Sequence, residues 1–223
     1  GPPGTGKTEI ARTLAKSTGC EFIVTDVTKL KGSYVGESAK RASEVWEKAR
    51  THGRAIIFVD ECDGVFARRG GTSTDAAVEE ITNAFLPMWD GLESSGQIWV
   101  VGATNKRDRV DEAIDSRFGE KIEIGLPDVP QRIEILKLEM RKLESTIEVP
   151  EFVGKATSGF AGRNLSKVAS AVFRLASQRG GQATDDMWRQ VIGQFATSTS
   201  DAVDSTARWD TLILQEPVLK RLR

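Results

Sequence analysis

Cysteine, histidine and long apolar runs are scarce in this sequence of 223 residues. Its two cysteines, Cys20 and Cys62, are too few for a disulfide framework or a metal cluster, and we interpret both as small buried residues in a reducing compartment. The single histidine, His52, excludes histidine-based zinc sites and Ser-His-Asp triads. No apolar run approaches the ~20 residues that span a bilayer, so the sequence predicts no membrane segment and a cytoplasmic location.

An excess of charge of either sign is also absent. The 31 basic and 32 acidic residues give a formal net charge of −1, which does not favour nucleic acid or an anionic membrane as a partner, although a local basic patch stays open. Hydrophobic residues at 39% and charged residues at 28% are typical of a globular protein. The sequence opens at Gly1 inside a motif, so we expect the first strand of the fold to precede it, outside this sequence.

Apolar patterning predicts an α/β fold for residues 1–126. Short apolar runs predict strands, and stripes at helical spacing predict helices between them. The predicted strands are residues 21–24, 55–60, 98–104 and 121–125, and the predicted helices surround 10–15, 39–49 and 77–88. Pro87 should kink or end the third helix early. Alternation of strands and helices favours a parallel sheet with helices on both faces.

The pattern changes after Pro127. Helical stripes then follow one another with no strong strand signal between them, which predicts a small all-helical lid domain over residues 128–196. The polar stretch at 197–206 predicts a flexible linker.

Residues 1–8, GPPGTGKT, match the phosphate-binding pattern G-x-x-x-x-G-K-[ST] and lead directly into a predicted helix. Gly4 and Gly6 let the backbone turn its N–H groups toward phosphate oxygens, and Lys7 brings a positive charge to the β- and γ-phosphates. The Thr8 hydroxyl can ligate Mg²⁺. We therefore predict a P-loop NTPase fold with ATP and Mg²⁺ as ligands. The predicted nucleotide-binding residues of the loop are Gly4, Thr5, Gly6, Lys7 and Thr8.

Polar side chains follow two of the predicted strands. Asp60 and Glu61 end the apolar run AIIFV, and Asn105 ends the segment IWVVGATN. Ligands of an open parallel sheet bind beyond the carboxyl ends of its strands. We therefore predict that Asp60 holds Mg²⁺, that Glu61 activates the attacking water, and that Asn105 contacts that water or the γ-phosphate. The alternatives are an acidic pair that caps the next helix and, for Asn105 taken alone, a turn residue.

Together these motifs resemble the AAA family of ATPases from Gly1 to about Phe195, and in particular the branch that contains katanin, spastin and the endosomal-sorting disassembly ATPases. GPPGTGKT is similar to the family's Walker A loop, IIFVDECD to its Walker B motif and VVGATN to its sensor 1 motif. DEAIDSRFGEKIEIGLPD resembles the segment that carries the arginine finger, TSGFAGRNL the lid motif beside the adenine, and KGSYVGES the first pore loop.

The resemblance implies roles for residues outside the phosphate loop. Arg117 would be the arginine finger that each subunit supplies to its neighbour, although many members of this branch carry two arginines where this chain has Ser116 and Arg117. Gly162 and Arg163 would contact the nucleotide from the lid. Arg163 stands where many relatives have alanine, and an exposed arginine early in a helix is an equal interpretation of it.

The resemblance also implies that Tyr34 and Val35 grip a polypeptide in a central pore. Taken alone, Tyr34 would be interpreted as partly buried against the sheet, and the family position reverses that preference. The flanking Gly32 and Gly36 predict a loop with freedom to move.

The implied activity is ATP hydrolysis in a homo-oligomeric ring, usually a hexamer in this family, coupled to remodelling, unfolding or disassembly of protein substrates. One rival is a DNA-directed AAA+ ATPase of the clamp- or helicase-loader type, which a basic stripe on the ring would favour. A second rival is an ATP-gated scaffold with little turnover, against which the Asp60–Glu61 pair argues. Residues 207–223 resemble the segment that precedes an AAA cassette, so we predict the start of a second cassette there, with a C-terminal helix of this cassette as the alternative.

Overall fold

The computed structural model describes residues 1–68, 76–91 and 97–199, and the chain divides into two compact units, Gly1–Leu126 and Pro127–Arg223. The predicted start of a second cassette at 207–223 lies outside the described residues, as does most of the predicted linker. Residues 197–199, which we expected to open that linker, are instead the last three residues of a helix.

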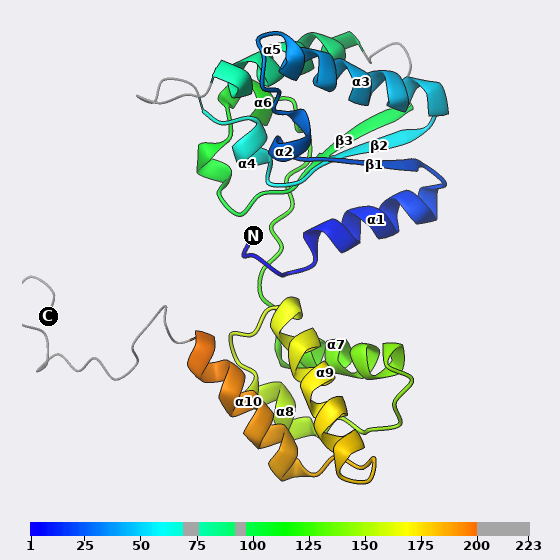
Figure 1. The fold of residues 1–223 in the computed structure, drawn as a ribbon, viewed down its shortest axis with the longest axis vertical. Helices are drawn as coiled ribbons and strands as arrows, with labels where there is room; N and C mark the ends of the chain where they lie inside the picture. The colour runs from blue at the N-terminus through cyan, green and yellow to red at the C-terminus, as the bar shows by residue number, and fades with distance from the viewer. Residues whose placement is uncertain (69–75, 92–96, 200–223) are drawn as a thin grey trace, which may run out of the picture. The chain divides into compact units, whose positions relative to one another are not determined.

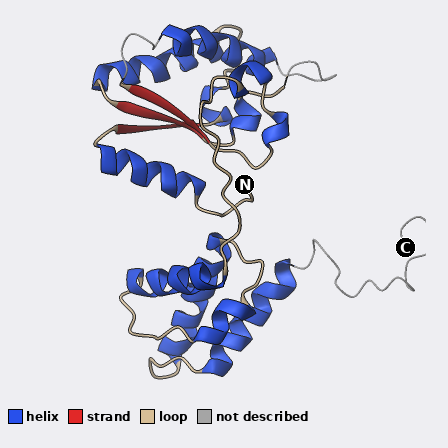
Figure 2. Ribbon diagram, turned by 180° about the vertical axis from the view of Figure 1, so that it is seen from behind, coloured by secondary structure: helices blue, strands red, loops and turns tan. Residues whose placement is uncertain are grey.

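The first unit is built on a parallel sheet of three strands in the order β1-β2-β3 (Figures 1 and 2). β1 spans Glu21–Thr25, β2 spans Ala55–Val59 and β3 spans Ile98–Gly102. The register pairs Thr25 with Val59 and Val59 with Gly102, so the three strands end level at one edge. All of β2 is buried, as expected of an apolar strand with a neighbour on each side. The predicted α/β fold with a parallel sheet is confirmed.

Helices cover both faces of this sheet (Figure 1). α1, Lys7–Thr18, lies on one face, where Ala11 shares a small core with Phe58. α3, Glu37–His52, and α5, Ala76–Asp90, pack on the other face. There Trp46 of α3 contacts Phe85 of α5 with ring centroids 5.4 Å apart, a spacing typical of edge-to-face aromatic packing.

Short elements extend from the carboxyl ends of the strands. α2, Val27–Leu30, follows β1, and α4, Cys62–Val65, follows β2, at the same end of the sheet as residues 1–6 (Figure 1). The 3₁₀ turn η2, Arg107–Arg109, and helix α6, Glu112–Asp115, follow β3. Three or four residues are too few to show a helical period, so the sequence did not predict these elements.

One sequence prediction for this unit is wrong in part and another is wrong. We expected Pro87 to kink the third helix or end it early. α5 does not end there but continues to Asp90, because proline removes only one hydrogen-bond donor and the helix has three residues left. A kink at Pro87 stays a prediction. Residues 121–125 do not form a strand, and Ile122 is 84% exposed. A strand needs a neighbour's backbone, and within the described sheet β3 pairs only with β2.

The second unit contains helices and no strand among its described residues. α7 spans Val129–Lys142, α8 Glu151–Ala156, α9 Gly162–Gln178 and α10 Asp185–Thr199. Asp128 caps α7 in a capping box with Gln131. Leu136, Leu165 and Trp188 bring α7, α9 and α10 into one apolar core. In the parts of both units that the structure describes, no helix is long and apolar enough to span a bilayer.

Candidate active site

Residues 1–6 form a loop that leads into α1. Gly4 has φ 76° and Gly6 has φ 89°, a left-handed backbone that residues with a side chain rarely adopt. Gly6 is also the N-cap of α1, and it offers no side-chain acceptor to the first N–H groups of that helix. The N-terminal end of α1 therefore presents backbone donors and the positive end of the helix dipole to an anion.

Lys7 ties this loop to the segment after β3. Its Nζ donates to the carbonyl oxygens of Gly1 at 2.8 Å and Pro2 at 2.7 Å, and to Asn105 Oδ1 at 2.7 Å. Burial lowers the pKa of Lys7, and the charge of Asp60 opposes that shift. The three acceptors are neutral, so an anionic phosphate would pair with the ammonium more strongly than they do.

Thr8 and Asp60 meet although 52 residues separate them. The Thr8 hydroxyl donates to Asp60 Oδ2 at 3.1 Å, and Asp60 Oδ1 accepts from the backbone N–H of Glu61 at 3.0 Å. A hydroxyl and a carboxylate that already touch can share a hard cation such as Mg²⁺. Mg²⁺ is usually bound through one or two carboxylates, with water and substrate phosphates as its other ligands, and the Thr8–Asp60 pair fits that kind of site.

Glu61 occupies a strained backbone position. Its φ of 48° and ψ of 48° lie in the left-handed region, which costs energy for a residue with a side chain and is found at functional sites. Glu61 is exposed and lines a cavity of about 250 Å³ together with Asp60 and the turn that follows β1, residues 26–28. The turn into α4 therefore places Glu61 at the same cavity as Asp60.

Two residues that the sequence analysis missed connect α4 to the segment that carries Asn105. The Thr104 hydroxyl donates to Asp63 Oδ1 at 2.6 Å and accepts from the backbone N–H of Lys106 at 2.8 Å. The N–H of Cys62 donates to Ala103 O at 2.9 Å, which joins the two backbones at the same place. The signal available in the sequence was the hydroxyl residue Thr104 directly before the candidate Asn105. This bond fixes the turn in which Asn105 lies.

The two cysteines differ in their surroundings. Cys62 is 3% exposed, as predicted, and burial raises its pKa to about 12, with the charge of Asp63 adding to the effect. Cys20 is only partly buried, so the prediction that both are core residues is wrong for Cys20. It follows Gly19 directly at the end of α1, where the chain turns into β1.

Arg117 lies outside this cluster, in contact with α5 and α6. Its Nε and Nη2 donate to Asp90 Oδ1 and Oδ2, each at 2.8 Å, and its Nη1 donates to Ala113 O at 2.7 Å. This two-armed pair lowers the pKa of Asp90. The guanidinium is therefore held by its own subunit, and its role as a finger stays a prediction.

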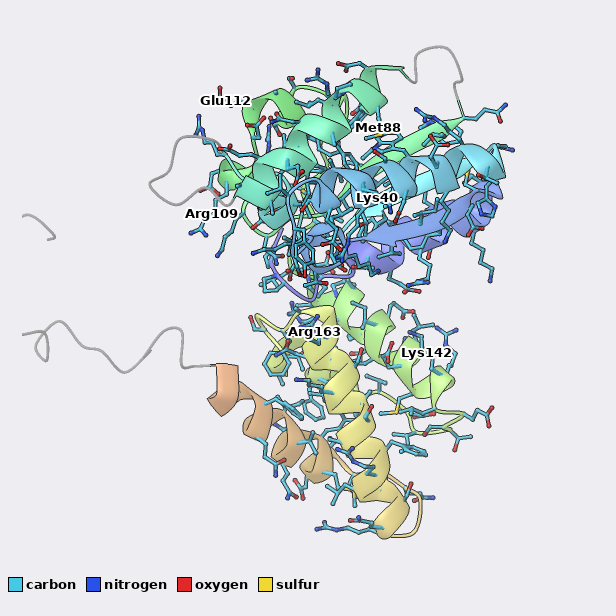
Figure 3. The ribbon with its side chains drawn as sticks, turned by 45° about the horizontal axis from the view of Figure 1, so that its top comes forward. Lys40, Met88, Arg109, Glu112, Lys142 and Arg163 are labelled. Atoms are coloured by element: carbon cyan, nitrogen blue, oxygen red, sulfur yellow. The ribbon has the colours of Figure 1, made fainter. Side chains whose placement is uncertain are left out.

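The remaining predicted residues lie apart from the phosphate loop or in the second unit. Tyr34 is 81% exposed and Val35 is fully exposed, so the alternative in which Tyr34 packs against the sheet is wrong. Gly162 and Arg163 lie in the first turn of α9. Arg163 is exposed and is labelled in Figure 3. Their contact with a nucleotide stays a prediction.

Comparison with known proteins gives the following relatives. Residues 1–126 match the family model described as "ATPase family associated with various cellular activities (AAA)". The chain is 36% identical over 198 residues to the probable 26S proteasome regulatory subunit 10B of Caenorhabditis elegans, covering 86% of this chain and 49% of that protein. It is 38% identical over 171 residues to the ATP-dependent zinc metalloprotease FtsH of Ureaplasma parvum, covering 75% and 24%. It is 38% identical over 168 residues to the cell division cycle protein 48 homolog of Archaeoglobus fulgidus, covering 74% and 23%.

The chain thus spans about half the length of the first relative and about a quarter of the other two. The katanin and spastin branch is not tested by these relatives and stays a prediction. The matched residues 1–126 are more than half of the chain and include the phosphate loop, Asp60, Glu61 and Asn105. The chain belongs to the AAA family of ATPases.

Proposed function

We propose that this chain binds ATP with Mg²⁺ and hydrolyses the nucleotide within a homo-oligomeric ring, usually a hexamer in this family, to remodel protein substrates. The observation that carries the proposal is the meeting of three distant segments at one edge of the sheet. Lys7 reaches Asn105 across 98 residues, and Thr8 reaches Asp60 across 52. A cytoplasmic location also stays a prediction.

The residues at this edge divide the work of hydrolysis. Lys7 and the N–H groups of the loop would bind the β- and γ-phosphates, and Thr8 and Asp60 would hold Mg²⁺, which neutralises phosphate charge. Glu61 would take a proton from water as its oxygen attacks the γ-phosphorus. The bond from the γ-phosphorus to the bridging oxygen then breaks, and ADP leaves with that oxygen. Asn105 would orient the water or the γ-phosphate.

Work on proteins is supported by the exposed pair Tyr34–Val35 and by the relatives. Two of them carry names that link them to proteolysis: a regulatory subunit of the 26S proteasome and a metalloprotease. An aromatic ring offers contact area to any passing side chain without demanding a sequence. The net charge of −1 does not support the DNA-directed alternative. The strained backbone of Glu61 argues against an ATP-gated scaffold, because a scaffold needs no positioned base.

A pair of variants tests the two halves of this proposal. Lys7→Ala is expected to weaken ATP binding by about 100-fold or more, because a charge-assisted contact to phosphate is lost. Tyr34→Ala should keep most of the ATPase activity and the melting temperature, since the side chain is exposed, but it should no longer unfold a tagged substrate protein. Titration with labelled ATP measures the effect of Lys7→Ala in the full chain. Phosphate release, thermal melting and substrate unfolding measure the effect of Tyr34→Ala. Unfolding at the wild-type rate by Tyr34→Ala would contradict the role in gripping substrate.

Thr104→Val should lower kcat by about 10-fold and leave KM for ATP nearly unchanged, because even a 1 Å misplacement of a reacting group is costly. Valine keeps the shape of threonine but cannot donate to Asp63. Thr104→Ser keeps the hydroxyl and is the matched control. Asp63→Ala breaks the same bond, so the double variant should be no slower than the slower single variant. Multiplied losses in the double variant would show that the two residues act separately.

A further inference from the structure

The loop that displays Tyr34 and Val35 is closed by the helix that follows it. Apolar side chains with 81% and 103% exposure are not held by packing, so their placement depends on the backbone that carries them. That backbone runs from Lys31 to Gly36 and enters α3 at Glu37.

Glu37 closes the loop with one carboxylate oxygen. Its Oε2 accepts from the backbone N–H of Ser33 at 2.7 Å and of Tyr34 at 3.2 Å. The backbone N–H of Glu37 in turn donates to Tyr34 O at 3.1 Å. The residue that carries the exposed ring is thus bound to Glu37 at both its N–H and its carbonyl.

Arg41 supports this carboxylate from the next turn of α3. Its Nη2 donates to Glu37 Oε1 at 2.6 Å, and its Nη1 donates to Lys31 O at 2.7 Å. A second anchor lies beside it, where the N–H of Gly32 donates to the hydroxyl of the buried Ser38 at 2.9 Å. The start, the middle and the end of the loop are therefore all bonded to the first turns of α3.

Both glycines are required by this fit. A Cβ on Gly32 would lie 2.4 Å from the Cβ of Glu37, so only glycine lets the loop approach the helix this closely. Gly36 has φ 84°, which the turn into α3 requires. The sequence-based expectation that Gly32 and Gly36 give the loop freedom to move stays a prediction. The pKa of Glu37 is lowered, chiefly by the N–H of Ser33 and then by Arg41, as expected of an ionised carboxylate that accepts these bonds.

We propose that Glu37, supported by Arg41, is the positioning residue that presents Tyr34 and Val35 to a polypeptide. The proposal rests on the proposed function of the exposed pair. A loop fixed before contact loses less conformational freedom on binding than a mobile one. It also carries force, because α3 continues to Trp46, which is fully buried against α5 and the sheet. Movement of α3 would therefore move the exposed pair with it.

The test compares variants of Glu37 with a matched variant on the same helix. Glu37→Ala removes the carboxylate that accepts from the loop, and Glu37→Gln keeps an acceptor without the charge. Glu47→Ala is the control, because Glu47 pairs with Arg50 at 2.6 Å on α3 and makes no contact with the loop among the described interactions. The readouts are amide hydrogen exchange at Ser33 and Tyr34, and the amount of tagged substrate protein unfolded per ATP hydrolysed.

Glu37→Ala should speed exchange at the two amides by about 10-fold or more, as expected when a bond to a charged acceptor is lost. Its unfolding per ATP should fall by about fivefold or more, with Glu37→Gln between it and the wild type, and Glu47→Ala should match the wild type. Unchanged amide exchange at Ser33 and Tyr34 in Glu37→Ala would overturn the inference. Faster exchange in this variant, with as much substrate unfolded per ATP as in the wild type, would overturn it as well. A different result would contradict the proposed function itself: the wild-type protein hydrolyses ATP but unfolds no substrate, and Tyr34→Ala behaves in the same way. That result would also remove this role for Glu37.

Discussion

Replacing Glu61 with glutamine is expected to lower kcat for ATP hydrolysis by about 10²–10⁴-fold, the usual contribution of a general base. Glutamine keeps the size of the side chain but cannot take a proton from water. Nucleotide affinity should change by less than about threefold, because the proposed mechanism assigns phosphate binding to Lys7 and the loop and not to Glu61. Binding of labelled ATP and release of phosphate, measured on the same preparation, separate the two effects.

Asp26→Asn is the matched control for this result. Asp26 lines the same cavity as Glu61, but its carboxylate caps α2 by accepting from the N–H groups of Thr28 and Lys29. Asparagine can keep those bonds, so turnover should stay near the wild-type rate. Equal losses in Asp26→Asn and Glu61→Gln would point to a general effect of acidic charge in the cavity. Wild-type turnover in Glu61→Gln would contradict its assignment as the base.

The sequence predicted the parallel sheet and the meeting of its strand ends because both follow from local chemistry. Short apolar runs such as 55–59 favour buried strands, and a parallel sheet puts the residues after each strand at one edge. Asp60 and Asn105 therefore had to lie near the loop that carries Lys7. The failure at residues 121–125 has the opposite cause, because an alternating pattern describes a strand only if a neighbour is there to pair with it.

Side-chain partners across elements were beyond prediction from the sequence. Glu37, Asp63 and Asp90 stand in the sequence as ordinary acidic residues. Their roles depend on which hydroxyl, guanidinium or N–H the fold brings to them, and no periodicity encodes that choice. The strained φ of Glu61 and the close approach at Gly32 are likewise properties of the assembled backbone.

Arg117→Ala is expected to produce the other large loss, about 10³-fold or more in turnover, with little change in nucleotide affinity. The reason is that a finger stabilises charge on the γ-phosphoryl group of the neighbouring subunit in the transition state. In this structure the Arg117 guanidinium instead donates two hydrogen bonds to the Asp90 carboxylate. The pair lowers the pKa of Asp90. The ion pair is therefore complete at a pH above the ordinary pKa of aspartate, and it is lost as the pH falls through the lowered pKa.

Asp90→Ala separates the two roles of Arg117. This variant breaks the same ion pair but leaves the guanidinium free to reach a phosphate. If Arg117 acts as a finger, Asp90→Ala should retain much of the turnover that Arg117→Ala loses. If Arg117 only holds α5 and α6 together, both variants should lose activity and stability alike. Phosphate release and thermal melting of the two variants, measured side by side, distinguish these results.

Mixing Arg117→Ala with Glu61→Gln subunits tests whether the arginine acts across a subunit boundary. Each variant alone is expected to be nearly inactive, the first for want of a finger and the second for want of a base. At equal amounts, about a quarter of the interfaces in a ring would join an intact Glu61 to a neighbour's intact Arg117. Turnover should therefore rise well above that of either variant. With ring assembly confirmed, no recovery at any mixing ratio would mean that Arg117 acts within its own subunit, where Asp90 already holds it.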